Sequence, residues 1–232
     1  MFITSEMKDS VSSEAYKSLR TAIRYCGTDK PIKTIVITSA LSEEGKSTVA
    51  GNLAISLSES GVNVLLIDCD LRNPTLHKRL DLSNGVGITN FLISDSTLKE
   101  TMIFIKPKLA FISAGKKAPN PSEILGSNTM SKFINEMKET VDYIIFDTPP
   151  VIPVTDSKLL AAKCDATILV VRANKSKEKY TLEAYKELKK VGANVIGTVF
   201  NDSEDKHKNK YYYCNEDRGK KKKYFKKKNK EG

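Results

Sequence analysis

The 232-residue sequence predicts an α/β fold with a doubly wound, mostly parallel β-sheet. Apolar runs alternate with stretches of helical period along the chain, which is the order of elements in such sheets. The apolar runs lack polar alternation, so helices are expected to cover both faces of the sheet. A phosphate-loop motif joins the first apolar run to a helical stretch. A chain of this length is most simply one domain with appendages.

Taken in order, the predicted strands are six apolar runs, at 34–38, 64–68, 109–113, 143–147, 166–171 and 195–201. Helical periodicity predicts five helices, at 13–25, 46–60, 127–140, 156–163 and 177–191. Segments 71–98 and 115–125 are less periodic, which predicts loops with short helices around a site.

The sequence ALSEEGKST at 40–48 is a phosphate-binding loop in the required context, between a strand and a helix. The loop N–H groups and the helix N-terminus would face a polyphosphate, with Lys46 on the phosphates and Ser47 on magnesium. Ala40 replaces the usual first glycine, which weakens the match without breaking it. A helix N-cap that merely reads GKST is the weaker alternative. The predicted nucleotide-binding residues of the loop are Glu43, Glu44, Gly45, Lys46, Ser47 and Thr48.

Three carboxylates follow apolar strands, with Asp68 and Asp70 in VLLIDCDLR at 64–72 and Asp147 in YIIFDTPP at 143–150. The carboxyl ends of parallel strands meet at one edge of a sheet, where α/β proteins bind ligands. In phosphate-loop proteins an aspartate in such a place holds magnesium. One aspartate alone could equally be a turn residue, but three behind a phosphate loop indicate a magnesium and phosphate site. An ordinary ATPase does not need the second acidic pair, so the phosphate has a further use.

The net charge of +10 lies mainly near the C-terminus, where residues 201–232 hold twelve Lys and Arg against six Asp and Glu. The segment 203–232 has almost no aliphatic residue, which predicts a disordered tail. Its mixture of basic and aromatic residues suits nucleic acid or an anionic membrane, and its clustered tyrosines suit phosphorylation. A merely solubilising tail is the third interpretation. The tail tyrosines are Tyr211, Tyr212, Tyr213 and Tyr224.

No run of about eighteen apolar residues and no apolar signal region occurs, which predicts a cytosolic protein. The four cysteines lack metal-ligand spacing and are expected to be reduced thiols. Cys69, between the two aspartates, is either a redox nucleophile or a buried residue at a strand end. Side-chain alternation along the strand favours burial.

These motifs, in this order, resemble the bacterial tyrosine kinases (BY-kinases) that control capsule and exopolysaccharide synthesis. SEAYKSLRTAIR at 13–24, NPSEIL at 120–125 and the strand that ends at Asn201 carry the resemblance further. It implies a protein-tyrosine kinase that uses ATP and Mg²⁺ on a P-loop NTPase fold of the MinD and ParA type. It assigns the phosphates to Lys46, the magnesium to Ser47, Asp70 and Asp147, and the acceptor hydroxyl to Asp68. By its position alone, Asn201 is expected near the adenine or its loop.

The resemblance also implies three regions: an N-terminal oligomerisation helix region at 1–30, a kinase domain at 31–202, and an autophosphorylation tail at 203–232. Glu14, Lys17 and Arg20 match the Glu-x-x-Arg-x-x-Arg motif through which family members form a ring and phosphorylate one another's tails. Lys17 stands in the first arginine position and lacks the planar guanidinium fork. Without the resemblance, simple packing on the sheet would be preferred for this helix.

The form found in Gram-positive bacteria is a separate cytosolic chain, activated at the inner face of the membrane by the cytosolic end of a transmembrane adaptor related to chain-length regulators. The resemblance therefore implies this adaptor and further copies of the chain as partners. A tyrosine phosphatase and downstream sugar enzymes are expected as antagonist and substrates. Nucleic acid is not an expected partner.

Two other classes of protein share part of this pattern. A positioning ATPase of the ParA or MinD type has the same sheet and loop, but its loop normally begins Lys-Gly-Gly, where this chain has Ser39, Ala40 and Leu41. A terminal tyrosine cluster would also be idle in such a switch. A DNA- or membrane-binding module would use the lysine-rich tail, and its binding would depend on salt and be lost on truncation at about Ser203.

Overall fold

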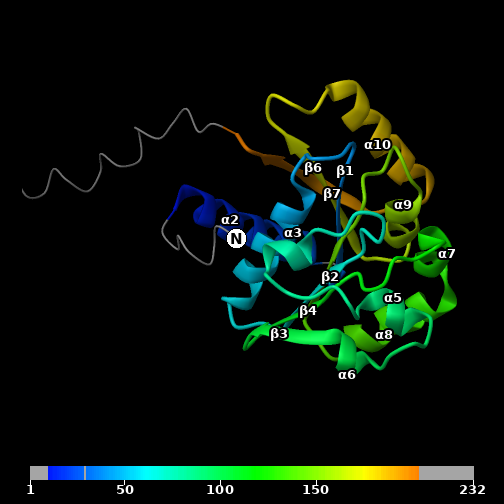
Figure 1. Ribbon diagram of the computed structural model, residues 1–232. Coiled ribbons are helices and arrows are strands. Elements are labelled where there is room, and N and C mark those ends of the chain that lie inside the picture. Colours follow the sequence, from blue (N-terminus) through cyan, green and yellow to red (C-terminus); the bar gives the residue numbers. More distant parts are fainter. Residues whose placement is uncertain (1–9, 29, 204–232) are drawn as a thin grey trace, which may run out of the picture. The chain divides into compact units, whose positions relative to one another are not determined.

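The computed structural model describes residues 10–28 and 30–203, and it shows a seven-stranded sheet with helices on both faces (Figure 1). The strand order is β3-β4-β2-β5-β1-β6-β7, and every neighbouring pair is parallel except β3 with β4. This confirms the predicted doubly wound, mostly parallel sheet. The chain divides into a compact unit, Met1–Asn201, and a second unit, Asp202–Gly232. The tail tyrosines and the predicted disorder of 203–232 lie outside the described residues, apart from Ser203 itself.

Six of the seven strands were predicted, with ends that agree to within one residue. They are β1 (Thr34–Ser39), β2 (Val64–Asp68), β4 (Leu109–Ile112), β5 (Tyr143–Asp147), β6 (Ala166–Arg172) and β7 (Val195–Asn201). The strand that was missed is β3 (Met102–Lys106), which forms an antiparallel hairpin with β4 at the sheet edge. Its side chains are half-buried or exposed, and Phe104 is 72% exposed, so β3 lacks the buried character of the other runs.

The five long predicted helices are present, each shorter at one or both ends except the first, which is longer. They are α2 (Val11–Cys26), α3 (Lys46–Ser58), α8 (Asn128–Lys138), α9 (Asp156–Ala161) and α10 (Glu178–Lys190). Segments 71–98 and 115–125, predicted as loops with short helices, hold α4 (Leu76–Arg79), α5 (Ile88–Leu92) and nearly all of α7 (Pro121–Gly126). The further short helix α6 (Leu98–Thr101) was not predicted and begins at the last residue of the first of these segments. None of the helices in the described ranges is long and apolar enough to cross a membrane.

The core has two layers because neighbouring residues of each buried strand point to opposite faces of the sheet. In β1, Ile35 and Ile37 pack with α2 and α3, whereas Val36 packs with α8, α9 and α10. The helix α2 buries Tyr16 and Ile23 in the first layer. Both faces of the sheet are thus covered, as the unbroken apolar runs predicted.

Asp165, just before β6, links β6 to the start of β1 and to α8 at the end of the sheet opposite the phosphate loop. Its carboxylate accepts hydrogen bonds from the N–H groups of Lys33 (3.1 Å) and Thr34 (3.0 Å), and it pairs with Lys138 of α8 at 2.9 Å. Burial alone would raise the pKa of Asp165, but the ion pair with Lys138 and these hydrogen bonds hold it below its usual value. This junction fixes β1 next to β6 at the end of the sheet opposite the phosphate loop.

Candidate active site

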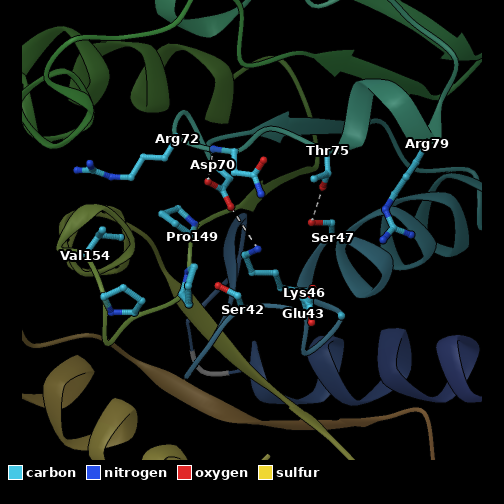
Figure 2. Close-up of a pocket in the computed structure, with 14 residues that line it drawn as sticks. Ser42, Glu43, Lys46, Ser47, Asp70, Arg72, Thr75, Arg79, Pro149 and Val154 are labelled. Carbon is cyan, nitrogen blue, oxygen red and sulfur yellow. Dashed lines mark hydrogen bonds and ion pairs between the residues drawn. The ribbon is translucent and has the colours of Figure 1, made fainter. Parts of the chain in front are cut away.

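A cavity of about 310 Å³ lies at the carboxyl ends of the central strands (Figure 2). Three loops line it: the phosphate loop after β1, the loop after β2, and the proline-rich loop after β5. This is the edge at which parallel α/β sheets bind ligands. Its lining residues are Ser42, Glu43, Gly45, Lys46, Ser47, Asp70, Arg72, Asn73, Thr75, Arg79, Pro149, Pro150, Pro153 and Val154.

Gly45 ends the phosphate loop and caps the N-terminus of α3. Its φ of +97° is left-handed, and a Cβ built there would lie 1.9 Å from Nδ2 of Asn201. That same Nδ2 donates a hydrogen bond to the Glu44 carbonyl at 3.1 Å. The glycine is therefore required both for the backbone turn and for the close approach of Asn201. The N–H groups at the start of α3 remain available for an anion, as the motif requires.

Asn201, expected near the adenine, thus lies against the phosphate loop at the end of β7. Glu43 and Glu44, which were expected to bind nucleotide, also hold the phosphate loop through contacts within the protein. The Glu44 carboxylate is buried and accepts hydrogen bonds from the Leu41 N–H (2.9 Å) and the Ser176 hydroxyl. Glu43, with φ of +62°, pairs with Lys175. These two acids therefore hold the shape of the phosphate loop.

Lys46 and Asp70 meet inside the cavity, with 3.2 Å between Nζ and Oδ2 and with side chains only 12% and 7% exposed. Asp70 also accepts a hydrogen bond from the Asn73 N–H at 3.0 Å, which closes the turn after β2. The Ser47 hydroxyl accepts a hydrogen bond from Thr75 at 3.1 Å. Figure 2 shows these side chains converging from α3 and from the β2 loop. The structure therefore brings together three of the residues that the sequence placed on phosphate and metal.

Asp68 is buried at the end of β2 and does not line the cavity. Its carboxylate accepts hydrogen bonds from three backbone N–H groups, those of Asp70 (3.1 Å), Thr75 (3.1 Å) and Leu76 (3.0 Å). Burial, and next the charge of Asp147, raise the pKa of Asp68 well above its usual value against these hydrogen bonds. In this arrangement Asp68 holds the loop that carries Asp70. Cys69, beside it, is buried as expected, and burial raises the pKa of its thiol.

Asp147 ends β5 beside Asp68 in the sheet, and both of its carboxylate oxygens are buried without a hydrogen-bond partner among the described residues. Burial raises its pKa to about 6, although Lys46 and next Ser47 act to lower it. Ser47 lowers the pKa of Asp147 because its hydroxyl lies close to the carboxylate, although it does not meet the geometry of a hydrogen bond to either oxygen. A buried carboxylate with two unused oxygens is the environment that a cation would complete.

The residues present fit magnesium rather than a metal held by the protein alone. In the described part of the chain, no group of three or more His, Cys, Asp and Glu residues could hold a metal ion by itself. Mg²⁺ commonly takes one or two protein oxygens and completes its shell with water and substrate phosphates. The unpaired oxygens of Asp147, the Ser47 hydroxyl and Asp70 supply such a partial set.

Arg72, Arg79 and the wall of Pro149, Pro150 and Pro153 also line the cavity, although no role was predicted for them. Arg72 is the last residue of the VLLIDCDLR motif, and this position was the only feature of the sequence that could have marked it as a site residue. The NPSEIL motif, which had no predicted role beyond the resemblance, forms the start of α7. The helix begins at Pro121 with Asn120 as its N-cap, and the Ser122 hydroxyl donates a hydrogen bond to Asp156 at 2.6 Å.

The predicted oligomerisation residues lie on α2, away from the cavity. Glu14 and Lys17 form an exposed ion pair within the helix at 2.6 Å. Arg20 donates a hydrogen bond to the Ser56 carbonyl of α3 at 2.6 Å, so its guanidinium packs α2 against α3 within this chain.

A phosphate loop after β1, an acidic loop after β2 and a buried aspartate after β5 define an α/β P-loop protein. A family model described as an AAA domain matches residues 32–202. Tyrosine-protein kinase YwqD of Bacillus subtilis (strain 168) is 36% identical, over 90% of this chain and 89% of its own. The putative tyrosine-protein kinase CapB of Staphylococcus aureus is 35% identical, over 90% of this chain and 92% of its own.

Two solved structures bear on the fold. The chimerical protein CapA2B2 has a TM-score of 0.83 at 30% identity, over 86% of this chain and 88% of its own. The septum site-determining protein MinD of Pyrococcus horikoshii OT3, complexed with Mg-ADP, has a TM-score of 0.61 at 23% identity over 72% of this chain and 69% of its own, which shows the fold alone. The chain belongs to the bacterial tyrosine-protein kinase family. It is accordingly a protein-tyrosine kinase rather than a positioning ATPase.

Proposed function

We propose that the protein is an autokinase that uses Mg²⁺ and ATP to phosphorylate the tyrosines of its own C-terminal tail in trans, within the control of capsule or exopolysaccharide synthesis. The pairing of Lys46 with Asp70 in the cavity, beside the unpartnered carboxylate of Asp147, is the observation that carries the proposal. A positioning ATPase shares the fold but gives no role to Tyr211, Tyr212, Tyr213 and Tyr224.

In this proposal, each of the following residues in or next to the cavity has one task. Lys46 and the N–H groups of the loop bind the phosphates, and Ser47, Asp70 and Asp147 hold the magnesium. When bound, the ion neutralises charge that develops on the transferred phosphoryl group. Lys46 leaves its pairing with Asp70 when phosphate enters, which frees the Asp70 carboxylate. Asn201 holds the Glu44 carbonyl of the phosphate loop and would lie near the adenine or its loop.

Asp68 is assigned to the acceptor tyrosine, whose hydroxyl it would orient or deprotonate. Its three backbone hydrogen bonds set a condition on that role: the Thr75 and Leu76 N–H groups must release the carboxylate when the acceptor binds. Phosphoryl transfer passes through a loose transition state that needs orientation more than a strong base. Asp68→Asn replaces one of the two oxygens that could accept the hydroxyl proton by an NH2 donor, which would misorient the acceptor. It should abolish transfer and spare most of the ATP affinity, which rests on Lys46 and the phosphate loop.

Assembly and localisation are also proposals. Residues 1–30 would mediate a ring of copies through Glu14, Lys17 and Arg20, residues 31–202 would form the kinase domain, and 203–232 would supply the acceptors. Because Arg20 already bonds to Ser56, ring formation would use the outer face of α2 or release that bond. The cytosolic end of a transmembrane adaptor would activate the kinase at the inner face of the membrane. A phosphatase and sugar enzymes would be its antagonist and substrates.

The test is intact-mass and peptide mass spectrometry after incubation with Mg²⁺ and ATP, with and without an adaptor peptide, beside Asp68→Asn. Phosphate on the tail tyrosines, absent from the variant, supports the proposal. ATP hydrolysis without phosphotyrosine in either condition contradicts it. Transfer in trans is tested by mixing a Lys46→Met chain with an active chain whose tail tyrosines are Phe. Phosphate on the Lys46→Met chain requires transfer between chains.

A further inference from the structure

Arg72, which lines the cavity, makes a two-pronged ion pair with Asp156. Its Nε donates to Oδ2 of Asp156 at 2.9 Å, and its Nη2 donates to Oδ1 at 3.1 Å. The Asp156 side chain, at the start of α9, is fully buried, whereas that of Arg72 is 43% exposed. A guanidinium held by both oxygens of a carboxylate is fixed in direction as well as in position.

Ser122 of the NPSEIL motif completes the same cluster. Its hydroxyl donates to Oδ1 of Asp156 at 2.6 Å, and it accepts hydrogen bonds from Arg72 Nη2 (3.3 Å) and from the Thr155 hydroxyl (3.2 Å). One buried carboxylate therefore joins the loop after β2, the start of α7 and the start of α9. Two of these segments line the cavity, through Arg72 and through Val154, which precedes α9.

This cluster is not expected to add much to the stability of the fold, because the desolvation free energy of a buried ion pair is about as large as the attraction between its charges. The position of the cluster indicates a different role. Arg72 follows Asp70 by two residues, and the Asn73 N–H bonds to Asp70 on the other side of Arg72. Fixing Arg72 therefore fixes the turn that presents Asp70 to Lys46.

We propose that Arg72, Asp156 and Ser122 are positioning residues that clamp the 70–73 turn, so that Asp70 keeps its place on the magnesium side of the cavity. This rests on the proposed function, in which Asp70 serves the metal. It gives NPSEIL a physical task that its sequence alone does not reveal. Groups that orient a metal ligand typically change metal affinity or activity by roughly 10–100-fold when removed.

The experiment compares Arg72→Ala, Arg72→Lys, Ser122→Ala and Asp156→Asn with the control Lys158→Ala. Lys158 lies two residues after Asp156 in α9. It pairs with Glu187 at 3.3 Å and does not line the cavity. Two quantities are measured in the full chain: the Mg²⁺ concentration that gives half of the maximal phosphorylation rate, and amide hydrogen exchange in the nucleotide-free protein.

We expect the half-saturating Mg²⁺ concentration to rise roughly tenfold in Arg72→Ala, and less in Arg72→Lys and Ser122→Ala. The acceptor KM should not change. Exchange should quicken at the Asn73 amide, because its bond to Asp70 depends on the clamped turn. Lys158→Ala should match the wild type in both measurements.

A fall in kcat with unchanged Mg²⁺ dependence and unchanged Asn73 exchange would overturn the proposal, since Arg72 would then act on the transferred phosphoryl group itself. If Asp156→Asn does not fold, Ser122→Ala still decides, because it removes one hydroxyl and no charge. Should the wild type prove inactive on tyrosine, the proposed function fails, and the hydrogen exchange of the nucleotide-free variants still tests the clamp.

Discussion

Replacing Asp147 by Asn should stabilise the protein when metal and nucleotide are absent. The Asp147 carboxylate is fully buried and has no hydrogen-bond partner among the described residues, and its pKa is raised from 3.8 to about 6. That rise corresponds to about 3 kcal/mol of stability at about 1.4 kcal/mol per pH unit. The folded state keeps this stability below pH 4, where the carboxyl is protonated in both states, and loses it as pH rises through about 6.

An asparagine carries no charge to desolvate, so Asp147→Asn should gain up to about 3 kcal/mol at pH 7.5 and nothing below pH 4. Urea unfolding in chelator at both pH values measures this difference. The control is Asp70→Asn, which strips the partly buried Lys46 of its partner and should destabilise at pH 7.5. Magnesium with ADP should stabilise the wild type more than Asp147→Asn. A variant less stable than the wild type at pH 7.5 without metal would refute the reasoning.

Gly45→Ala should lower nucleotide affinity at least tenfold. Gly61, which has a similar φ of +90° but open space around it, is the control, and Gly61→Ala should cost only the backbone strain, about 1–3 kcal/mol of unfolding free energy. If the two variants have equal effects in calorimetric titration and in unfolding, a role for Asn201 is contradicted. Asp165→Asn should lose about 1–3 kcal/mol of unfolding free energy at pH 7. Because the pKa of Asp165 is lowered, that loss should begin to shrink as pH falls below about 4, the usual carboxyl value, and a loss constant down to pH 3 would count against the prediction. Replacing the four tail tyrosines by Phe should end self-phosphorylation but leave ATP affinity and transfer to a tyrosine copolymer unchanged, as titration and radiolabelling would show.

The sequence predicted the sheet well because its central strands are buried on both faces and therefore appear as unbroken apolar runs. The strand β3 escaped prediction because it lies at the edge, with Phe104 exposed, and a two-residue turn at 107–108 joins it to β4. Its pairing depends on a neighbour rather than on its own pattern.

The candidate site was predictable as a set of residues but not as a set of contacts. A strand-end position marks Asp68 and Asp70 equally, yet only Asp70 lines the cavity, because the backbone at Thr75 and Leu76 folds over Asp68. The pairing of Arg72 with Asp156 spans 84 residues, a separation at which local sequence carries no signal.

The bond from Asn201 to the Glu44 carbonyl has a consequence for biosynthesis. The phosphate loop is translated early, but one of the bonds that hold it comes from Asn201, at the end of the final strand among the described residues. A ribosome-bound nascent chain that has not yet exposed β7 lacks this support, so nucleotide should stabilise its partly folded forms less than it stabilises the finished domain. The kinase domain should therefore reach its full affinity for ATP late, after synthesis has passed residue 201.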